Sequence, residues 1–195
     1  MKIIYIMGKS STGKDTIFKK LKEKINVKPY VMYTTRPKRT GEINGVDYNY
    51  LSDAEMNGYL TLQSNMLIES RTYDTVYGKW TYATILDNQF NPNKDLLMTG
   101  TLESYIHIKE FFEGNEAVEL IPIYIEVEDG LRLERALKRE REQKEPKYVE
   151  MCRRFIADSI DFSEDNIESI GIKKRFQNII LDDCVNEISE YVKNL

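Results

Sequence analysis

A glycine-rich segment near the start of the chain has residue types and spacing suited to binding phosphate. Residues 8–16 are GKSSTGKDT, in which a lysine directly follows the second glycine. Gly8 and Gly13 allow backbone conformations that a Cβ would penalise, so that successive N–H groups can turn toward one anion. Lys14 adds a mobile positive charge for the outer phosphates of a nucleotide. The segment therefore predicts a loop that binds the phosphates of ATP.

The flanking residues predict the elements that would hold this loop. Residues 3–7 are a continuous apolar run typical of a buried strand, and residues 16–21 have apolar residues at helical spacing. A helix that begins near Lys14 would direct its unpaired amides and positive dipole end at the same anion. An ordinary turn with a chance lysine is the alternative, and the agreement of strand, spacing and helix disfavours it. The predicted ATP-binding residues are Gly8, Lys9, Ser10, Ser11, Thr12, Gly13, Lys14, Asp15 and Thr16.

Asp15 departs from the usual form of such a loop. The loop lysine is commonly followed by Ser or Thr, whose hydroxyl binds Mg²⁺. A carboxylate suits a helix N-terminus but repels a triphosphate unless a cation lies between them. We therefore expect Asp15 to face Mg²⁺, either directly or through a water molecule.

Composition limits the class of protein. The chain has 195 residues, 41% hydrophobic content and a formal net charge of -4, which fits one globular domain without a basic field that would attract nucleic acid. It has no apolar run of about 18 residues and no leader pattern, so we expect a cytoplasmic protein without a membrane partner. Cys152 and Cys184 are expected to be free thiols. The sequence leaves the oligomeric state open.

The remaining chain alternates predicted strands and helices, which is typical of an α/β fold. Strand patterns occur at residues 31–34, 94–99, 118–127 and 175–181, and helical patterns at 130–143, 148–162 and 185–192. Such alternation predicts a parallel sheet covered by helices on both faces. Residues 36–90 break the rhythm and predict a small inserted subdomain that contacts the ligand beyond the strand ends.

A second segment, around two arginines, also has residue types that could bind phosphate. Arg36 and Arg39 lie three residues apart, next to Pro37 and Gly41, and Tyr48 follows nearby. Their guanidinium groups could hold one phosphate in a stiffened loop, with the tyrosine hydroxyl donating to another of its oxygens. A solvated basic loop is an equally good interpretation from composition alone.

This stretch carries a resemblance to a known family. Residues 34–48, TTRPKRTGEINGVDY, resemble the nucleoside-monophosphate-binding signature of guanylate kinases, and the resemblance extends over nearly the whole chain. It implies a P-loop NTPase fold in a single domain over 1–195. The core would be 1–35, 91–135 and 155–195, the nucleoside-monophosphate-binding insertion about 36–90, and a helical lid about 136–154.

The same resemblance implies roles for individual residues. Arg36, Arg39, Tyr48 and Tyr77 would bind the phosphate of GMP, and Glu69 would accept from the N1 and N2 donors of guanine. Without the resemblance, Glu69 would be interpreted as an exposed strand residue.

The predicted helix at 130–143 resembles the lid of that family. Arg135 and Arg139 lie four apart, hence on one helical face, and match the arginines that close over ATP. Arg154 matches an arginine from the next helix, and Lys14 completes the predicted catalytic set. The rest of residues 132–147 is expected to be a solvated, charged surface.

Several positions depart from the family pattern where the base would be recognised. Met32 replaces a serine that helps to bind guanine, and Lys79 replaces a small hydroxyl residue. The strand end at 97–101 lacks the aspartates that the family places there, and Thr99 or Thr101 could supply a hydroxyl instead but no negative charge. Guanine selectivity would therefore depend mainly on Glu69.

The sequence is compatible with three functions. The leading one is Mg²⁺-assisted phosphoryl transfer from ATP to GMP or dGMP, a step of purine nucleotide metabolism. A ribose bisphosphate phosphokinase-like enzyme is the second, since such enzymes can carry the Gly13-Lys14-Asp15 sequence. A non-catalytic guanylate-kinase-like binding module is the third, although such a module has no need of Lys14 or of lid arginines.

Overall fold

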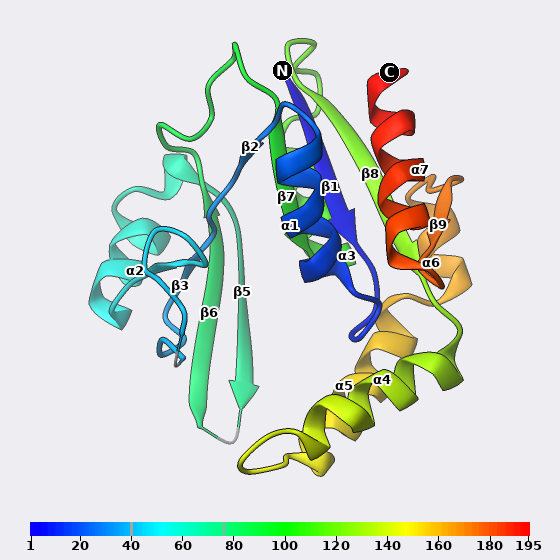
Figure 1. Ribbon diagram of the computed structural model, residues 1–195. Helices are drawn as coiled ribbons and strands as arrows, with labels where there is room; N and C mark the ends of the chain where they lie inside the picture. The colour runs from blue at the N-terminus through cyan, green and yellow to red at the C-terminus, as the bar shows by residue number, and fades with distance from the viewer. Residues whose placement is uncertain (40, 76) are drawn as a thin grey trace.

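The main sheet of the computed structural model is parallel and has five strands in the order β2-β7-β1-β8-β9 (Figure 1). The structure describes residues 1–39, 41–75 and 77–195; Thr40 of the predicted phosphate-binding signature and Val76 lie outside this range. The strands are β1 (Lys2–Met7), β2 (Lys28–Pro29), β7 (Leu96–Gly100), β8 (Glu119–Glu126) and β9 (Arg175–Gln177). The prediction of a parallel sheet is confirmed.

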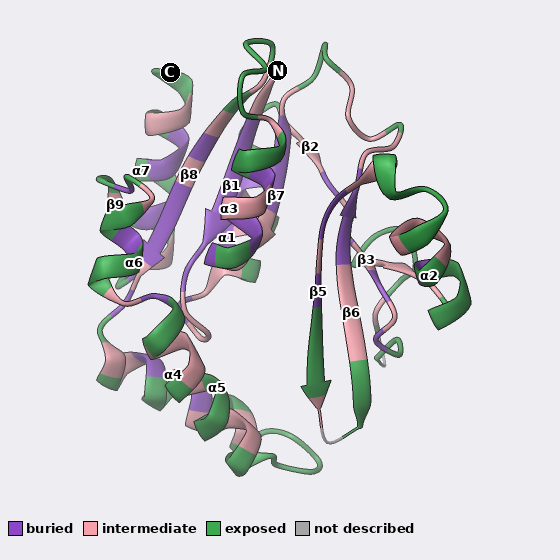
Figure 2. Cartoon of the chain, turned by 180° about the vertical axis from the view of Figure 1, so that it is seen from behind, coloured by how far each residue is buried: buried purple, intermediate pink, exposed green. Residues whose placement is uncertain are grey.

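Helices cover both faces of this sheet, because the side chains of β1 alternate between two apolar cores. Ile4 and Ile6 pack against α1 (Lys14–Lys24) and α7 (Leu181–Lys193). Ile3 and Tyr5 face α3 (Leu102–Phe111) and α6 (Glu164–Ser169) on the other side. Figure 2 shows the buried central strands and the exposed outer surfaces of these helices. The strands therefore end together at one edge, where β1 runs into the glycine-rich loop.

A second, four-stranded sheet in the order β4-β3-β6-β5 stands beside the first. It contains β3 (Tyr33–Thr34), β4 (Asn49–Tyr50), β5 (Leu67–Thr75) and β6 (Gly78–Ile85), with α2 (Asp53–Thr61) and the 3₁₀ turn η1 (Ser64–Met66) against its outer side. β5 and β6 form an antiparallel hairpin. Three strands of this sheet, β4, β5 and β6, thus come from residues 36–90, and the sheet also includes β3.

Two further helices lie across the carboxyl ends of the main strands (Figure 1). They are α4 (Asp129–Arg141) and α5 (Tyr148–Asp161). The glycine-rich loop, the second sheet and these two helices therefore surround one space. The assignment of these parts as core, nucleotide-binding insertion and lid remains a prediction. Among the helices of the described residues, none has the length and apolar character needed to span a bilayer.

Candidate active site

The glycine-rich loop has a backbone shape that requires both of its glycines. Gly8 has φ 152°, and a Cβ there would lie 2.4 Å from the carbonyl oxygen of Ile125. Gly13 has φ 90° and caps α1, and a Cβ there would lie 2.4 Å from Nδ2 of Asn178. That Nδ2 donates to the carbonyl oxygen of Thr12 at 2.7 Å. Asn178, from the end of β9, therefore holds the loop in place from outside.

Ser11 introduces strain into the same loop. Its φ of 64° makes it the one non-glycine residue with a positive φ among those that the structure describes. A Cβ in this conformation costs roughly 1–2 kcal/mol. Its hydroxyl oxygen is also buried without a hydrogen-bond partner in the described part of the chain. The loop thus holds a residue whose conformation glycine would adopt more readily.

Lys14 lies folded against its own loop. Its Nζ donates to the carbonyl oxygens of Gly8 at 2.5 Å and Lys9 at 3.0 Å. Burial lowers the pKa of Lys14, and the negative charges of Asp15 and Asp158 oppose that shift. An anion in the loop would offer the ammonium group charged oxygens in place of these two neutral carbonyls.

Arg132 and Asp158 connect the loop to helices α4 and α5. Arg132 Nε donates to the carbonyl oxygen of Ser10 at 3.0 Å, and Asp158 accepts from the Ser10 amide at 2.7 Å. The Arg132 guanidinium also lies 4.8 Å from the ring centre of Phe155. Residues 132–147 were expected to be mainly solvated, and this was wrong for Arg132, which is 1% exposed. Its burial depends on Asp158 and Ser10, which lie far from it in sequence.

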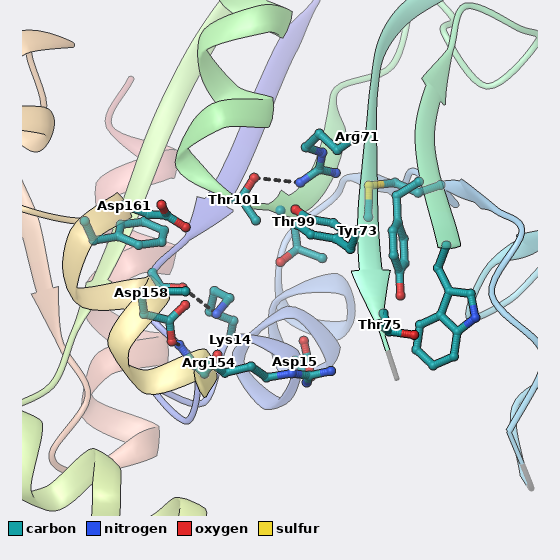
Figure 3. A pocket seen from close by; sticks show the side chains of 18 of the residues that line it. Lys14, Asp15, Arg71, Tyr73, Thr75, Thr99, Thr101, Arg154, Asp158 and Asp161 are labelled. Atoms are coloured by element: carbon teal, nitrogen blue, oxygen red, sulfur yellow. Dashed lines mark hydrogen bonds between the residues drawn. The ribbon is translucent and has the colours of Figure 1, made fainter. Parts of the chain in front are cut away.

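A cleft of about 350 Å³ is lined by predicted site residues from the loop, the second sheet and α5. Six of the residues that line it are Lys14, Asp15, Tyr48, Tyr82, Arg154 and Asp158. Figure 3 shows Lys14, Asp15 and Arg154 grouped at one end of this cleft, and Arg71 with Thr101 at the other. The structure therefore places the loop and Tyr48 on a single shared space.

Arg36 lies behind this cleft in a buried ion pair. Its guanidinium donates to Glu42 at 2.7 Å and lies 5.2 Å from the ring centre of Tyr48. Partial burial alone would raise the pKa of Glu42, but hydrogen bonds from Arg36, Tyr50 and the Arg39 amide lower it to about 2. Arg39 itself is exposed. Glu42 therefore orients the loop that carries both arginines.

Tyr77 is not among the residues that line the cleft. It is 59% exposed, beside the turn of the β5–β6 hairpin, with its ring stacked on Trp80 and Lys147 Nζ 4.2 Å from the ring centre. Tyr82 lines the cleft instead, with its ring centre 5.8 Å from that of Tyr48. The role of Tyr77 in binding phosphate therefore stays a prediction, and Tyr82, which the sequence analysis did not single out, is a second candidate.

Glu69 is buried, not exposed, and its carboxylate is already engaged by the protein. It accepts from Arg71 Nε at 3.0 Å, Thr84 Oγ1 at 2.7 Å and Ser104 Oγ at 2.9 Å. Arg71, which the sequence analysis did not single out, stands between Glu69 and the cleft and lines it. The expected direct contact between Glu69 and guanine is therefore not supported by this arrangement.

The predicted lid arginines have different partners. Arg135 donates to the carbonyl oxygen of Asn178 at 2.9 Å, while Arg154 Nε donates to Glu150 at 2.9 Å. Arg139 and Arg154 line one small cavity beside Ser10. The structure thus brings Arg139 of the predicted lid and Arg154 of the next helix to the glycine-rich loop, whereas Arg135 contacts Asn178, which follows β9.

Carboxylates reach the cleft from two elements. Asp15 is exposed at the start of α1 and lines the cleft, as do Asp158 and Asp161 of α5. Burial and the charge of Asp158 raise the pKa of Asp161. Mg²⁺ is commonly held by one or two carboxylates together with substrate phosphates and water. The donor set at Asp15 fits that requirement.

Comparison with known proteins gives the family. The sequence model described as guanylate kinase matches residues 1–195. The chain belongs to the guanylate kinase family. Its fold agrees, since the crystal structure of guanylate kinase from Anaplasma phagocytophilum superimposes with a TM-score of 0.64 at 20% identity over 99% of this chain and 85% of that one.

Guanylate kinases of several bacteria are similar in sequence. The protein of Clostridium tetani is 28% identical over 62% of this chain and 56% of its own length, and that of Clostridioides difficile 29% over 64% and 60%. The protein of Caldanaerobacter subterraneus is 26% identical over 98% of this chain and 84% of its own length. The first two matches thus span less than two thirds of the guanylate kinases concerned.

Proposed function

We propose that this protein transfers the γ-phosphoryl group of ATP to GMP or dGMP. The main observation that supports this proposal is that Lys14 of the glycine-rich loop and Tyr48 of the second sheet line one cleft. Such a cleft can hold the donor phosphates and the acceptor phosphate next to each other, which is the main requirement of phosphoryl transfer. Membership of the guanylate kinase family supports the same reaction.

The donor phosphates would bind at the start of α1. The backbone amides of residues 8–16 and the helix dipole favour an anion there, and Lys14 would exchange its two carbonyl partners for phosphate oxygens. Arg139 and Arg154, beside Ser10, would neutralise charge on the moving phosphoryl group. One arginine in this role can contribute about 10³-fold or more in rate.

The acceptor phosphate would bind at the opposite side of the cleft. Tyr48 and Tyr82 would donate from their hydroxyl groups, and Arg36, next to Tyr48, would supply positive charge. Arg39 is exposed and would join them when the loop folds inward. Closure of the cleft would exclude water, which strengthens each of these interactions.

Mg²⁺ is the metal that we propose for this site, with Asp15 as its protein ligand, directly or through water. The ion would neutralise charge on the β and γ phosphates. Asp15 follows Lys14 directly, so its carboxylate lies next to the proposed position of those phosphates. We further propose that the enzyme is cytoplasmic, with nucleotides and not nucleic acid as partners.

A coupled ADP-release assay tests this function. GMP, dGMP, AMP, UMP and ribose 1,5-bisphosphate are supplied in turn with ATP and Mg²⁺. We expect turnover with GMP and dGMP, and a higher melting temperature with either ATP–Mg²⁺ or GMP, because ligands that bind the folded state stabilise it. Turnover with the sugar phosphate alone, or no turnover and no thermal shift with any nucleotide, would overturn the proposal.

A further inference from the structure

The inner end of the cleft holds a buried arginine that faces the ligand space. Arg71, on β5, is 7% exposed and lines the cleft. Figure 3 shows its guanidinium next to Thr101, at the start of α3, across the cleft from Lys14. A buried guanidinium in a binding cleft is costly unless its donors are paired. The pairing of its N–H groups therefore shows what the site can recognise.

Three of the five N–H donors of Arg71 have partners within residues 1–39, 41–75 and 77–195. Nε donates to Glu69 Oε2 at 3.0 Å and Nη2 to Glu69 Oε1 at 3.4 Å. Nη1 donates to Thr101 Oγ1 at 2.6 Å. A guanidinium carries five donors, so one N–H remains on each Nη atom. Glu69 holds the edge formed by Nε and Nη2, so the outer end with Nη1 and Nη2 can act as a fork for a ligand with two acceptors.

Two polar groups next to Arg71, those of Glu69 and Thr101, are already engaged. Glu69 is shielded by Arg71, and its side chain is 0% exposed. Thr101 Oγ1 accepts from Arg71 and from the Ser104 amide, which it caps. Met32, on the cleft wall, has an apolar side chain. Thr99 and Tyr73 also line the cleft near this end, but each offers one hydroxyl, whereas Arg71 offers several directed N–H donors.

The low net charge at the inner end of the cleft, where Arg71 and Glu69 pair, favours a neutral group of the ligand. Glu69 neutralises Arg71 through two hydrogen bonds, so the pair offers directed donors with little net charge. A second phosphate would need uncompensated positive charge. Two neighbouring acceptors on an uncharged ring match the fork better.

We propose that Arg71 determines acceptor specificity by donating to O6 and N7 of a 6-oxopurine. This inference rests on the proposed function and names its substrate class. A bidentate contact of arginine with these two atoms is the commonest specific contact with guanine in protein–DNA complexes, which shows that the geometry is favourable. Adenine carries an amino group in place of O6, so a donor would meet a donor. Because the Glu69 carboxylate is engaged, the 2-amino group of guanine gains no partner there. IMP is therefore accepted as well as GMP.

The first test measures kcat/KM for GMP, IMP and AMP at saturating ATP. The wild-type protein is expected to use GMP and IMP within about tenfold of each other, and AMP at least 100-fold less well. A preference for GMP over IMP of more than 100-fold overturns the inference, since it means that a protein acceptor reads the 2-amino group, yet it leaves the proposed function intact. Absence of turnover and of thermal stabilisation with every nucleotide overturns both.

Variants locate the effect at Arg71. Arg71→Met with Glu69→Gln removes both charges, so no unpaired ion is left in the interior. We expect kcat/KM for GMP and IMP to fall about 10- to 100-fold through KM, with AMP and the KM for ATP unchanged. An unaltered ratio of GMP to AMP overturns the inference.

Two further variants serve as controls for this test. Arg71→Lys retains the charge next to Glu69 but lacks the planar fork, so it should keep the melting temperature and lose most of the preference for GMP over AMP. Arg175→Met, at β9 on the far edge of the main sheet, removes an arginine of similar ion pairing with Glu126 and Glu164. It should leave the three-nucleotide ratios as in wild type.

Discussion

Arg132 and Asp158 pair at 3.3 Å and hold Ser10 by both sides of its backbone, one through the carbonyl oxygen and the other through the amide. The pair therefore joins α4 and α5 to the glycine-rich loop. Arg132 is almost fully buried, whereas the Asp158 side chain is 18% exposed. Leaving such a buried charge without its partner lowers the free energy of unfolding. Removing the charged side chain also loses the hydrogen bonds that it makes.

Arg132→Met is expected to lower the free energy of unfolding by about 3 kcal/mol, because it removes the hydrogen bonds to Ser10 and leaves Asp158 without its partner. Urea unfolding at pH 7 measures this change. Arg153→Met is the matched control, since Arg153 is exposed and pairs with Glu150 on α5; it should cost less than about 0.5 kcal/mol. Equal effects of the two substitutions would show that the buried contacts stabilise nothing extra.

Ser11→Gly is expected to stabilise the protein by about 0.5–1 kcal/mol. Glycine adopts the φ of 64° without the steric penalty, and it removes a buried hydroxyl that has no partner among the described residues. Ser11→Ala separates the two causes, because it removes the hydroxyl and keeps the Cβ. Thermal and urea unfolding of both variants measure the difference, and an alanine variant as stable as the glycine variant would assign the effect to the hydroxyl.

Lys14→Met is expected to lower kcat by at least about 100-fold, since the loop loses the charge that faces the donor phosphates. The dissociation constant for GMP should change less than about threefold, because the acceptor site is built from the second sheet. Steady-state assays and calorimetric titration measure the two quantities. A loss of GMP affinity as large as the loss of turnover would contradict the proposed division of the cleft.

Tyr82→Phe and Tyr77→Phe distinguish the two candidate phosphate ligands. A hydrogen bond to a charged group contributes roughly 1.5–3 kcal/mol, so loss of the Tyr82 hydroxyl should raise the KM for the acceptor about tenfold or more. Tyr77→Phe should leave that KM unchanged, since Tyr77 is mostly exposed beside the hairpin turn. The opposite order of effects would favour Tyr77 as the phosphate ligand.

Glu42 should make stability depend on pH in acid. Its pKa is about 2 in the folded protein and near 4.5 when unfolded, so its stabilisation is complete above pH 4.5 and is lost as the pH falls toward 2. Glu42→Gln should therefore lower the melting temperature at pH 7, and the difference from wild type should shrink between pH 4.5 and 2. Glu113→Gln, at an exposed site beyond α3, serves as the control. A difference that stays constant over this range would refute the assignment.

The glycine-rich loop and the main sheet were predictable because their signals are local. The apolar run of β1, the spacing of Gly8 and Gly13 and the helical pattern after Lys14 each specify structure within a few residues. The position of Asn178, which holds this loop, was not predictable, because it depends on the pairing of β9 with β8.

Arg71 shows why part of the site escaped the sequence analysis. Glu69 and Arg71 are two residues apart on a strand and so share one face, which could have suggested an ion pair. The burial of Arg71, however, requires Thr101 and α3, which come 30 residues later in the chain. Tyr77 was predicted because Tyr77-Gly78 matches a family motif, and Tyr82 was not considered, because only the hairpin register places it beside Tyr48.

The contact between Lys147, at the start of α5, and Tyr77 connects the helical pair to the tip of the second sheet. Any movement of α5 away from Tyr77 would therefore have to break this contact. A solvent-accessible cation–π contact contributes about 0.5–1 kcal/mol. That is roughly a two- to fivefold bias, so thermal motion alone breaks this contact often, and the two elements are held together only weakly at this point.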